Sequence, residues 1–140
     1  MQKITGKLYA SHHTGLFLLE NGKAKRLANT DGLWQVKQLQ SNPKFAIGGT
    51  YSGLYLFKIN AKMELEPVQR IAGFNESSRF FEEDHQGRIW VGQFYKGLYQ
   101  LNLSNELTIN SVNKVSDKYD LPIHEQIILS RADNELYLAT

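Results

Sequence analysis

The sequence contains no cysteine among its 140 residues, and only three prolines. Without cysteine the chain forms no disulfide, offers no thiolate to a metal and has no cysteine nucleophile. That absence is compatible with either the cytosol or the periplasm. The longest apolar stretches, Gly15–Leu19 and Gly53–Phe57, are far too short to cross a bilayer. No basic stretch followed by an apolar segment opens the chain, so we expect neither a signal peptide nor membrane contact from this segment.

An excess of charge of one sign is also missing. The chain has 16 basic and 14 acidic residues, and the two signs are interspersed. Nucleic-acid binding needs basic residues gathered on one face or stripe. The densest basic group, Lys23, Lys25 and Arg26, lies beside an Asn-Gly turn, which is typical of a solvated hairpin end. We therefore predict a soluble globular domain that does not bind nucleic acid.

The four histidines predict no metal site. His12 and His13 are adjacent, and neighbours on a strand point to opposite faces. Both could ligate one metal only if their loop curls. His85 and His124 lie in predicted connections at other points of the chain. The sequence also lacks G-x-S-x-G, P-loop and H-E-x-x-H motifs.

An internal repeat runs through the chain. Its copies are Gly6–Phe17, Lys44–Tyr55 and Arg88–Tyr99, with a fourth that begins at Asn134. The matched positions Leu8, Phe45, Ile89 and Leu136 are separated by 37, 44 and 47 residues. A period in the forties that consists of strands and turns is typical of propeller blades, whereas helical repeats show a 3.6-residue pattern that is not seen here.

Each copy divides into four short strands with turn residues between them. In the second copy we predict strands at Trp34–Gln40, Phe45–Gly48, Gly53–Ile59 and Glu64–Ile71, and in the third at Ser78–Glu83, Arg88–Gly92, Gly97–Leu103 and Leu107–Val115. No α-helix longer than two turns is expected, and Asn113–Glu125 is the weakest point of that prediction. Trp34 and Trp90 are interpreted as core residues.

The third strand of each copy is apolar on both faces near its start, which fits burial between two stacked sheets. Gly15, Gly53 and Gly97 open these strands, where we expect positive φ or close backbone approach. The fold class is therefore all-β: a β-propeller fragment of about three four-stranded antiparallel blades. It forms a single segment over residues 1–140, with repeats at approximately 1–32, 33–77, 78–124 and a partial 125–140.

One family pattern matches the third copy. The run FEEDHQGRIWVG from Phe81 to Gly92, followed by GLYQL from Gly97 to Leu101, resembles the two-component regulator propeller repeat. That repeat runs, schematically, I-x-x-D-x-x-G-x-L-W-I-G-T and then G-L-x-x-L. The second copy departs from it, with Ala46 in place of the Trp and Gly49-Thr50 shifted by one. In the first and fourth copies Tyr9 and Tyr137 fill the Trp position.

The resemblance implies structural roles for Asp84, Gly87, Trp90 and Gly92, with Asp84 in a turn where its side chain caps the backbone. The run Glu82, Glu83 and Asp84 otherwise suggests paired carboxylates for glycoside hydrolysis. With Asp84 assigned to the turn, we interpret Glu82 and Glu83 as the outer end of a strand. We predict no catalytic residue, no cofactor and no enzyme activity for this segment.

The resemblance also implies a function. Such repeats form large propellers in the sensor regions of bacterial hybrid two-component histidine kinases and LuxR-like regulators, notably in Bacteroidetes, and the better-understood members sense glycans. It implies a non-catalytic sensor or ligand-recognition segment, periplasmic as part of a membrane-anchored sensor, or alternatively cytoplasmic. A full-length parent could carry a histidine kinase. The alternatives are a protein–protein interaction or assembly propeller, and a lyase or hydrolase on a propeller scaffold.

Ligand contact is expected from the loop between the second and third strands of each copy. These loops would lie on one face of a propeller, and their aromatic and amide side chains suit sugar stacking and hydrogen bonding. The predicted ligand-binding residues are His12, His13, Thr50, Tyr51, Gln93, Phe94, Tyr95 and Lys96. The alternative is ordinary loop packing, in which Tyr51 and Tyr95 fill gaps between blades.

The number of blades needed to close a propeller ring determines which partners we expect. Propellers close with roughly four to eight blades, so three repeats cannot form a ring alone. We expect the chain to associate with other propeller blades or with a second copy of itself, two copies giving a six-bladed ring.

Overall fold

The computed structural model describes residues 1–94, 96–121 and 126–139, and every regular element in this part of the chain is a β-strand. It therefore contains no helix that could span a membrane. The strands form four antiparallel sheets, each a simple meander in chain order. The chain is thus all-β and made of four-stranded antiparallel sheets plus one smaller sheet, as the repeat predicted.

The sheets follow one another along the sequence. The first consists of β1 (Gln2–Ile4), β2 (Lys7–His12), β3 (Gly15–Glu20) and β4 (Lys23–Ala28). The second consists of β5 (Leu33–Gln38), β6 (Phe45–Thr50), β7 (Gly53–Ile59) and β8 (Leu65–Ile71). The third consists of β9 (Phe80–Glu83), β10 (Ile89–Gln93), β11 (Gly97–Leu103) and β12 (Ile109–Lys114). The fourth has two strands, β13 (Ile128–Ala132) and β14 (Glu135–Ala139).

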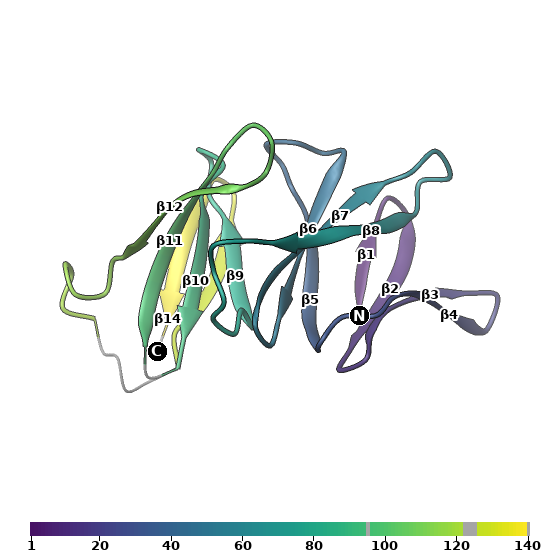
Figure 1. Ribbon diagram of the computed structural model, residues 1–140, viewed down its shortest axis with the longest axis horizontal. Coiled ribbons are helices and arrows are strands. Elements are labelled where there is room, and N and C mark those ends of the chain that lie inside the picture. The colour runs from purple at the N-terminus through teal and green to yellow at the C-terminus, as the bar shows by residue number, and fades with distance from the viewer. Residues whose placement is uncertain (95, 122–125, 140) are drawn as a thin grey trace.

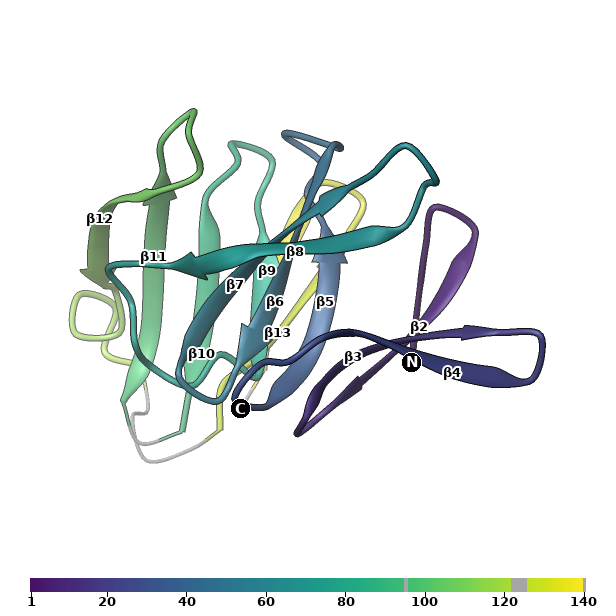
Figure 2. The same cartoon turned by 45° about the vertical axis from the view of Figure 1, so that its right-hand side comes forward.

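Consecutive sheets pack against each other through their first strands. β5 contacts β1 and β2, and β13 contacts β9 and β10, while β8 contacts β4 farther out. Figures 1 and 2 show the sheets side by side, from the purple first sheet to the green third and yellow fourth. This arrangement is compatible with consecutive blades of a propeller, although the described residues close no ring.

The predicted strands of the second and third copies agree with the observed ones to within two residues at each end. The segment expected to be weakest, 113–125, begins with the end of β12 and continues in a turn over residues 116–120, whereas residues 122–125 lie outside the described residues. The third strand of the second copy is buried on both faces, as expected: Leu54 and Leu56 belong to the core shared with the third sheet, and Phe57 to the core shared with the first.

The glycines that open the third strands have the expected backbone conformation, with positive φ. Gly53 has φ of +132°, and a Cβ placed on it would lie 2.4 Å from the carbonyl oxygen of Phe74. Gly15 repeats this geometry with φ of +137° and the carbonyl of Ala28, and Gly97 has φ of +99°. Both reasons given for glycine, positive φ and close approach, therefore hold at the start of β3 and β7.

Strand register corrects the alignment of the second copy. The pairs His12–Gly15, Thr50–Gly53 and Gln93–Gly97 close equivalent hairpins. Counting back from them places Ile47, rather than Ala46, at the position of Tyr9 and Trp90. The cores agree, because Tyr9, Ile47 and Trp90 each pack toward the following sheet, whereas Ala46, Ile89 and Leu136 pack toward the preceding one. The alignment made from the sequence had therefore matched Phe45 and Ala46 with residues whose side chains lie on the opposite face of the sheet.

Candidate functional site

Three equivalent turns gather at one end of the molecule. The turns β2–β3, β6–β7 and β10–β11 all point to the lower side of Figure 2. We call this side the hairpin end, defined by residues 12–15, 50–53, 93–94 and 96–97. The predicted ligand-binding residues that the structure describes lie on these three turns, so the fold brings them to one side of consecutive sheets.

A row of side chains in contact lies between the second and third sheets at this end. The rings of Tyr51 and Trp34 have centroids 4.6 Å apart. The guanidinium carbon of Arg79 lies 5.0 Å from the centroid of Trp34 and 5.2 Å from that of Phe80. In the order Tyr51, Trp34, Arg79, Phe80, two aromatic rings in contact are followed by a cation that lies close to the rings of Trp34 and Phe80 and is attracted to them. We call these four side chains the aromatic ladder.

Trp34 is 38% exposed, so its interpretation as a core residue was wrong. The reason is a β-bulge: Leu33 pairs with Thr50 and Gln35 with Gly49, which leaves Trp34 without a partner between them. A bulge redirects the side chain of its extra residue. Here it turns the indole outward against Tyr51, which is itself 44% exposed.

Hydrogen bonds hold the connector between β8 and β9 against the ladder. Trp34 Nε1 donates to Ser77 Oγ at 3.2 Å, and Gln35 Nε2 donates to the carbonyl of Arg79 at 2.8 Å. The N–H of Ser78 donates to the carbonyl of Thr50 at 2.9 Å. The ladder is thus fixed by two sheets and by the segment that joins them.

The charge of Arg79 is not neutralised within the described chain. Its side chain is exposed and forms no ion pair there, and aromatic rings lie near its guanidinium on two sides. Stacking leaves the N–H groups at the edge of a guanidinium able to donate. The hairpin end therefore offers exposed ring surface beside a free cationic donor.

The other predicted residues differ in their roles. Thr50 is buried, where its hydroxyl donates to Gly53 O and accepts from Ser52 N. Gln93 is buried too, and its Nε2 finds no partner among the described residues. Lys96 pairs with Glu76 at 2.7 Å, and this hydrogen bond raises the pKa of Lys96. Phe94 is exposed, and Tyr95 lies outside the described residues.

The turn that carries His12 and His13 does curl. Their ring centroids are 4.0 Å apart, and His12 Nδ1 lies 3.0 Å from Thr14 Oγ1. No third histidine, cysteine or carboxylate joins them within the part of the chain that the structure describes. Neither ring contacts the aromatic ladder through a described interaction.

The three consecutive carboxylates all have structural partners. Asp84 caps its turn as expected, because its Oδ1 accepts from the N–H of Gln86 and of Arg88. Glu83 ends β9, as interpreted, but it is buried and accepts hydrogen bonds from the N–H groups of Gln40 and Ser41, just after β5 of the preceding sheet. Glu82, also mostly buried, pairs with Lys37. Each of these three carboxylates is therefore engaged by partners within the fold.

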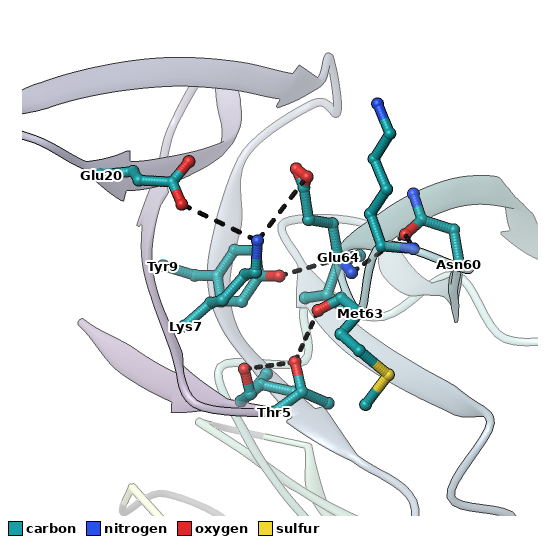
Figure 3. A network of polar contacts seen from close by, with 10 residues as sticks. Thr5, Lys7, Tyr9, Glu20, Asn60, Met63 and Glu64 are labelled. Carbon is teal, nitrogen blue, oxygen red and sulfur yellow. Dashed lines mark hydrogen bonds and ion pairs between the residues drawn. The ribbon is translucent and has the colours of Figure 1, made fainter.

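A second polar network lies between the first and second sheets (Figure 3). The hydroxyl of Tyr9 accepts a hydrogen bond of 3.0 Å from the N–H of Leu65, and Thr5 Oγ1 donates to Met63 O at 2.7 Å. Lys7 lies 4.0 Å from Glu64. Burial raises the pKa of Tyr9, and its hydrogen bond with Leu65 opposes that rise only in part. These contacts dock one sheet on the next, so we assign them to structure.

Comparison of the chain with models of known families, with curated proteins and with solved structures finds no match.

Proposed function

We propose that this segment is a non-catalytic ligand-recognition unit of a bacterial signal-transduction regulator, with its sheets acting as propeller blades and a glycan as its ligand. The observation that carries the proposal is the aromatic ladder at the hairpin end. The resemblance of the third copy to sensor propellers supports the signalling role, in the periplasm as part of a membrane-anchored sensor or alternatively in the cytoplasm.

The ladder suits a sugar on physical grounds. Exposed faces and edges of Trp34 and Tyr51 offer apolar surface to the C–H groups of a pyranose ring, as rigid aromatic side chains do in other recognition sites. Arg79 supplies N–H donors for hydroxyl or carboxylate oxygens. Because stacking already orders these side chains, binding costs little additional conformational entropy.

The test is titration calorimetry of the 140-residue chain with a panel of neutral and uronic-acid oligosaccharides. We expect saturable binding of at least one of them, lost in Trp34→Ala and weakened at least about tenfold in Arg79→Ala. Tyr119→Ala is the matched control, because Tyr119 is an exposed tyrosine beside Lys118 and outside the ladder. Binding that survives Trp34→Ala, or no binding by the folded wild-type chain, would reject the ladder as the site.

A protein-interaction or assembly role is the second candidate. It is favoured by apolar side chains that remain exposed on the first and fourth sheets, Leu8 and Tyr137 among them. A pull-down that recovers one partner in fixed stoichiometry, with no effect of oligosaccharides on melting, would support this role over ligand recognition.

A further inference from the structure

Equivalent positions of the repeat differ sharply in exposure at the two ends of the chain. Leu8 is 39% exposed, whereas its equivalents Ala46 and Ile89 are fully buried against the preceding sheet. Tyr137 is 55% exposed, whereas its equivalent Tyr9 is fully buried against the following sheet. The first sheet therefore has an uncovered backward face, and the fourth sheet an uncovered forward face.

These two faces are complementary halves of one interface. The chain makes this interface between the first and second, second and third, and third and fourth sheets, each time with a forward face against a backward face. Leu8 and its cross-strand neighbour Lys3 lie on the uncovered backward face. On the forward face, Tyr137 and Ile128 lie on the side of the fourth sheet opposite to Ile127 and Leu129, which pack against the third sheet.

Charge follows the same repeat. Lys3, Glu83 and Arg131 occupy equivalent positions, opposite Leu8, Ile89 and Leu136. Glu83 accepts from the N–H groups of Gln40 and Ser41, just after β5 of the preceding sheet, and Arg131 Nη1 donates to the carbonyl of Glu83 at the end of β9. In each case the side chain reaches the end of the preceding sheet's first strand.

No sheet precedes Lys3 in the described chain. The equivalent strand end that no later sheet of the described chain follows is the end of β13, the first strand of the fourth sheet, and the turn after it carries Asp133. Neither Lys3 nor Asp133 has an ion-pair partner in the part of the chain that the structure describes. Charge also divides between the ends: residues 1–28 hold five lysines and arginines against one glutamate, and residues 115–140 hold five acidic residues against two basic ones. Lys3 at one uncovered face and Asp133 beside the other are thus opposite in charge and occupy corresponding places of the repeat.

We propose that two copies of this 140-residue chain bind head to tail, with the Leu8 face of one copy on the Tyr137 face of the other and Lys3 paired with Asp133 across the contact. Such a contact is heterologous, and it closes when the rotation per copy allows. The two-stranded fourth sheet takes a position of its own, so two copies contribute eight sheets instead of the six expected from three repeats. Eight lies within the range at which propellers close. The contact does not depend on the ligand proposed above.

Sedimentation velocity at micromolar concentration tests the contact. We expect wild type to be a dimer, and Leu8→Asp and Tyr137→Asp each to be monomeric, because each places a charge in one half of the interface. Val112→Asp is the matched control: Val112 is also 39% exposed, but it lies on β12, the outermost strand of the third sheet. It should remain dimeric. Circular dichroism before each run verifies that the variants are folded.

Mixing the two monomeric variants distinguishes head-to-tail binding from a symmetric dimer. Leu8→Asp keeps an intact Tyr137 face and Tyr137→Asp keeps an intact Leu8 face, so an equimolar mixture should form 1:1 dimers through one interface. Lys3→Glu should weaken the wild-type dimer at least several-fold, and Lys3→Glu with Asp133→Lys in the same chain should restore it. A monomeric wild-type chain, or a mixture that stays monomeric, overturns the proposal.

Discussion

Trp90 Nε1 donates a hydrogen bond of 2.8 Å to Oδ2 of Asp84, which links the middle of β10 to the turn that precedes it. The same carboxylate accepts from the side chain of Arg88 at 2.7 Å and from two backbone N–H groups. The indole is half-buried and packs against the core shared by the third and fourth sheets. One buried aspartate therefore fixes both the turn and the orientation of the indole.

Trp90→Ala should lower the free energy of unfolding by about 2–4 kcal/mol. A fully buried indole would cost about 3–5 kcal/mol, and part of this one remains in solvent. Urea denaturation measures the change. Trp34→Ala provides the comparison, because the exposed Trp34 should cost about 1 kcal/mol or less. A loss below about 1 kcal/mol for Trp90→Ala would contradict its packing in the core.

Asp84 should make the fold sensitive to acid. Burial alone would raise the pKa of Asp84, but the hydrogen bonds that Trp90, Arg88 and Gln86 donate outweigh it and hold that pKa below the usual value. A depressed folded pKa gives stability that is present above the unfolded pKa of about 4 and is lost as pH falls toward the folded one. In urea titrations below about pH 4, Asp84→Asn should therefore lose less stability than wild type as pH falls. Parallel pH curves for the two proteins would show that the carboxylate carries no such linkage.

Periodicity predicts the strands inside the second and third sheets because these strands alternate between two cores, and a run such as Leu54–Phe57 can satisfy that pattern only as a buried strand. Local departures from regular strand pairing could not be predicted from the sequence. The bulge at Trp34 reverses the side on which the indole lies, and the one-residue shift that places Ile47 at the Trp position follows from hairpin register. Neither the bulge nor the one-residue shift can be recognised from the residue types at these positions.

The candidate site was foreseen in part for the same reason. Loop position pointed to Tyr51, but Arg79 ends the connector that follows β8 and Phe80 begins β9, and both residues had been placed in the predicted strand Ser78–Glu83. The burial of Glu83 was not predicted because its partners, the backbone N–H groups of Gln40 and Ser41, are more than 40 residues away. Side chains that bind distant backbone leave no pairwise signature in a single sequence.

Tyr9→Phe should cost about 1–3 kcal/mol, although it removes only one oxygen. The hydroxyl is the acceptor for the N–H of Leu65, and a buried donor left without its partner incurs the full desolvation penalty. Burial also raises the pKa of Tyr9, so wild type should lose stability as pH rises above about 10, and the variant should lose less. Tyr119→Phe, at an exposed tyrosine, is the control and should leave the free energy of unfolding close to that of wild type. A neutral Tyr9→Phe would mean that Leu65 finds another acceptor.

Gly49→Ala should destabilise the chain more than Gly48→Ala, although the two residues are neighbours on β6. A Cβ on Gly49 would lie 2.0 Å from the carbonyl oxygen of Ser78, whereas on Gly48 its nearest atom would be a methyl group of Leu33 at 2.7 Å. The methyl group can rotate away, but Ser78 is held by its hydrogen bond to Thr50. Overpacking of this kind costs about 1–3 kcal/mol, and we expect Gly49→Ala to lie at the upper end of that range.

The same substitution should disturb the aromatic ladder, because Ser78 lies between Ser77 and Arg79 in the connector that supports Trp34. Gly49→Ala should therefore change the tryptophan fluorescence of the folded state, and Gly48→Ala should leave it close to wild type. Urea denaturation followed by fluorescence gives both quantities in one experiment. Equal destabilisation by the two variants, with unchanged emission, would show that the connector moves freely and that the ladder is not fixed by the sheet beneath it.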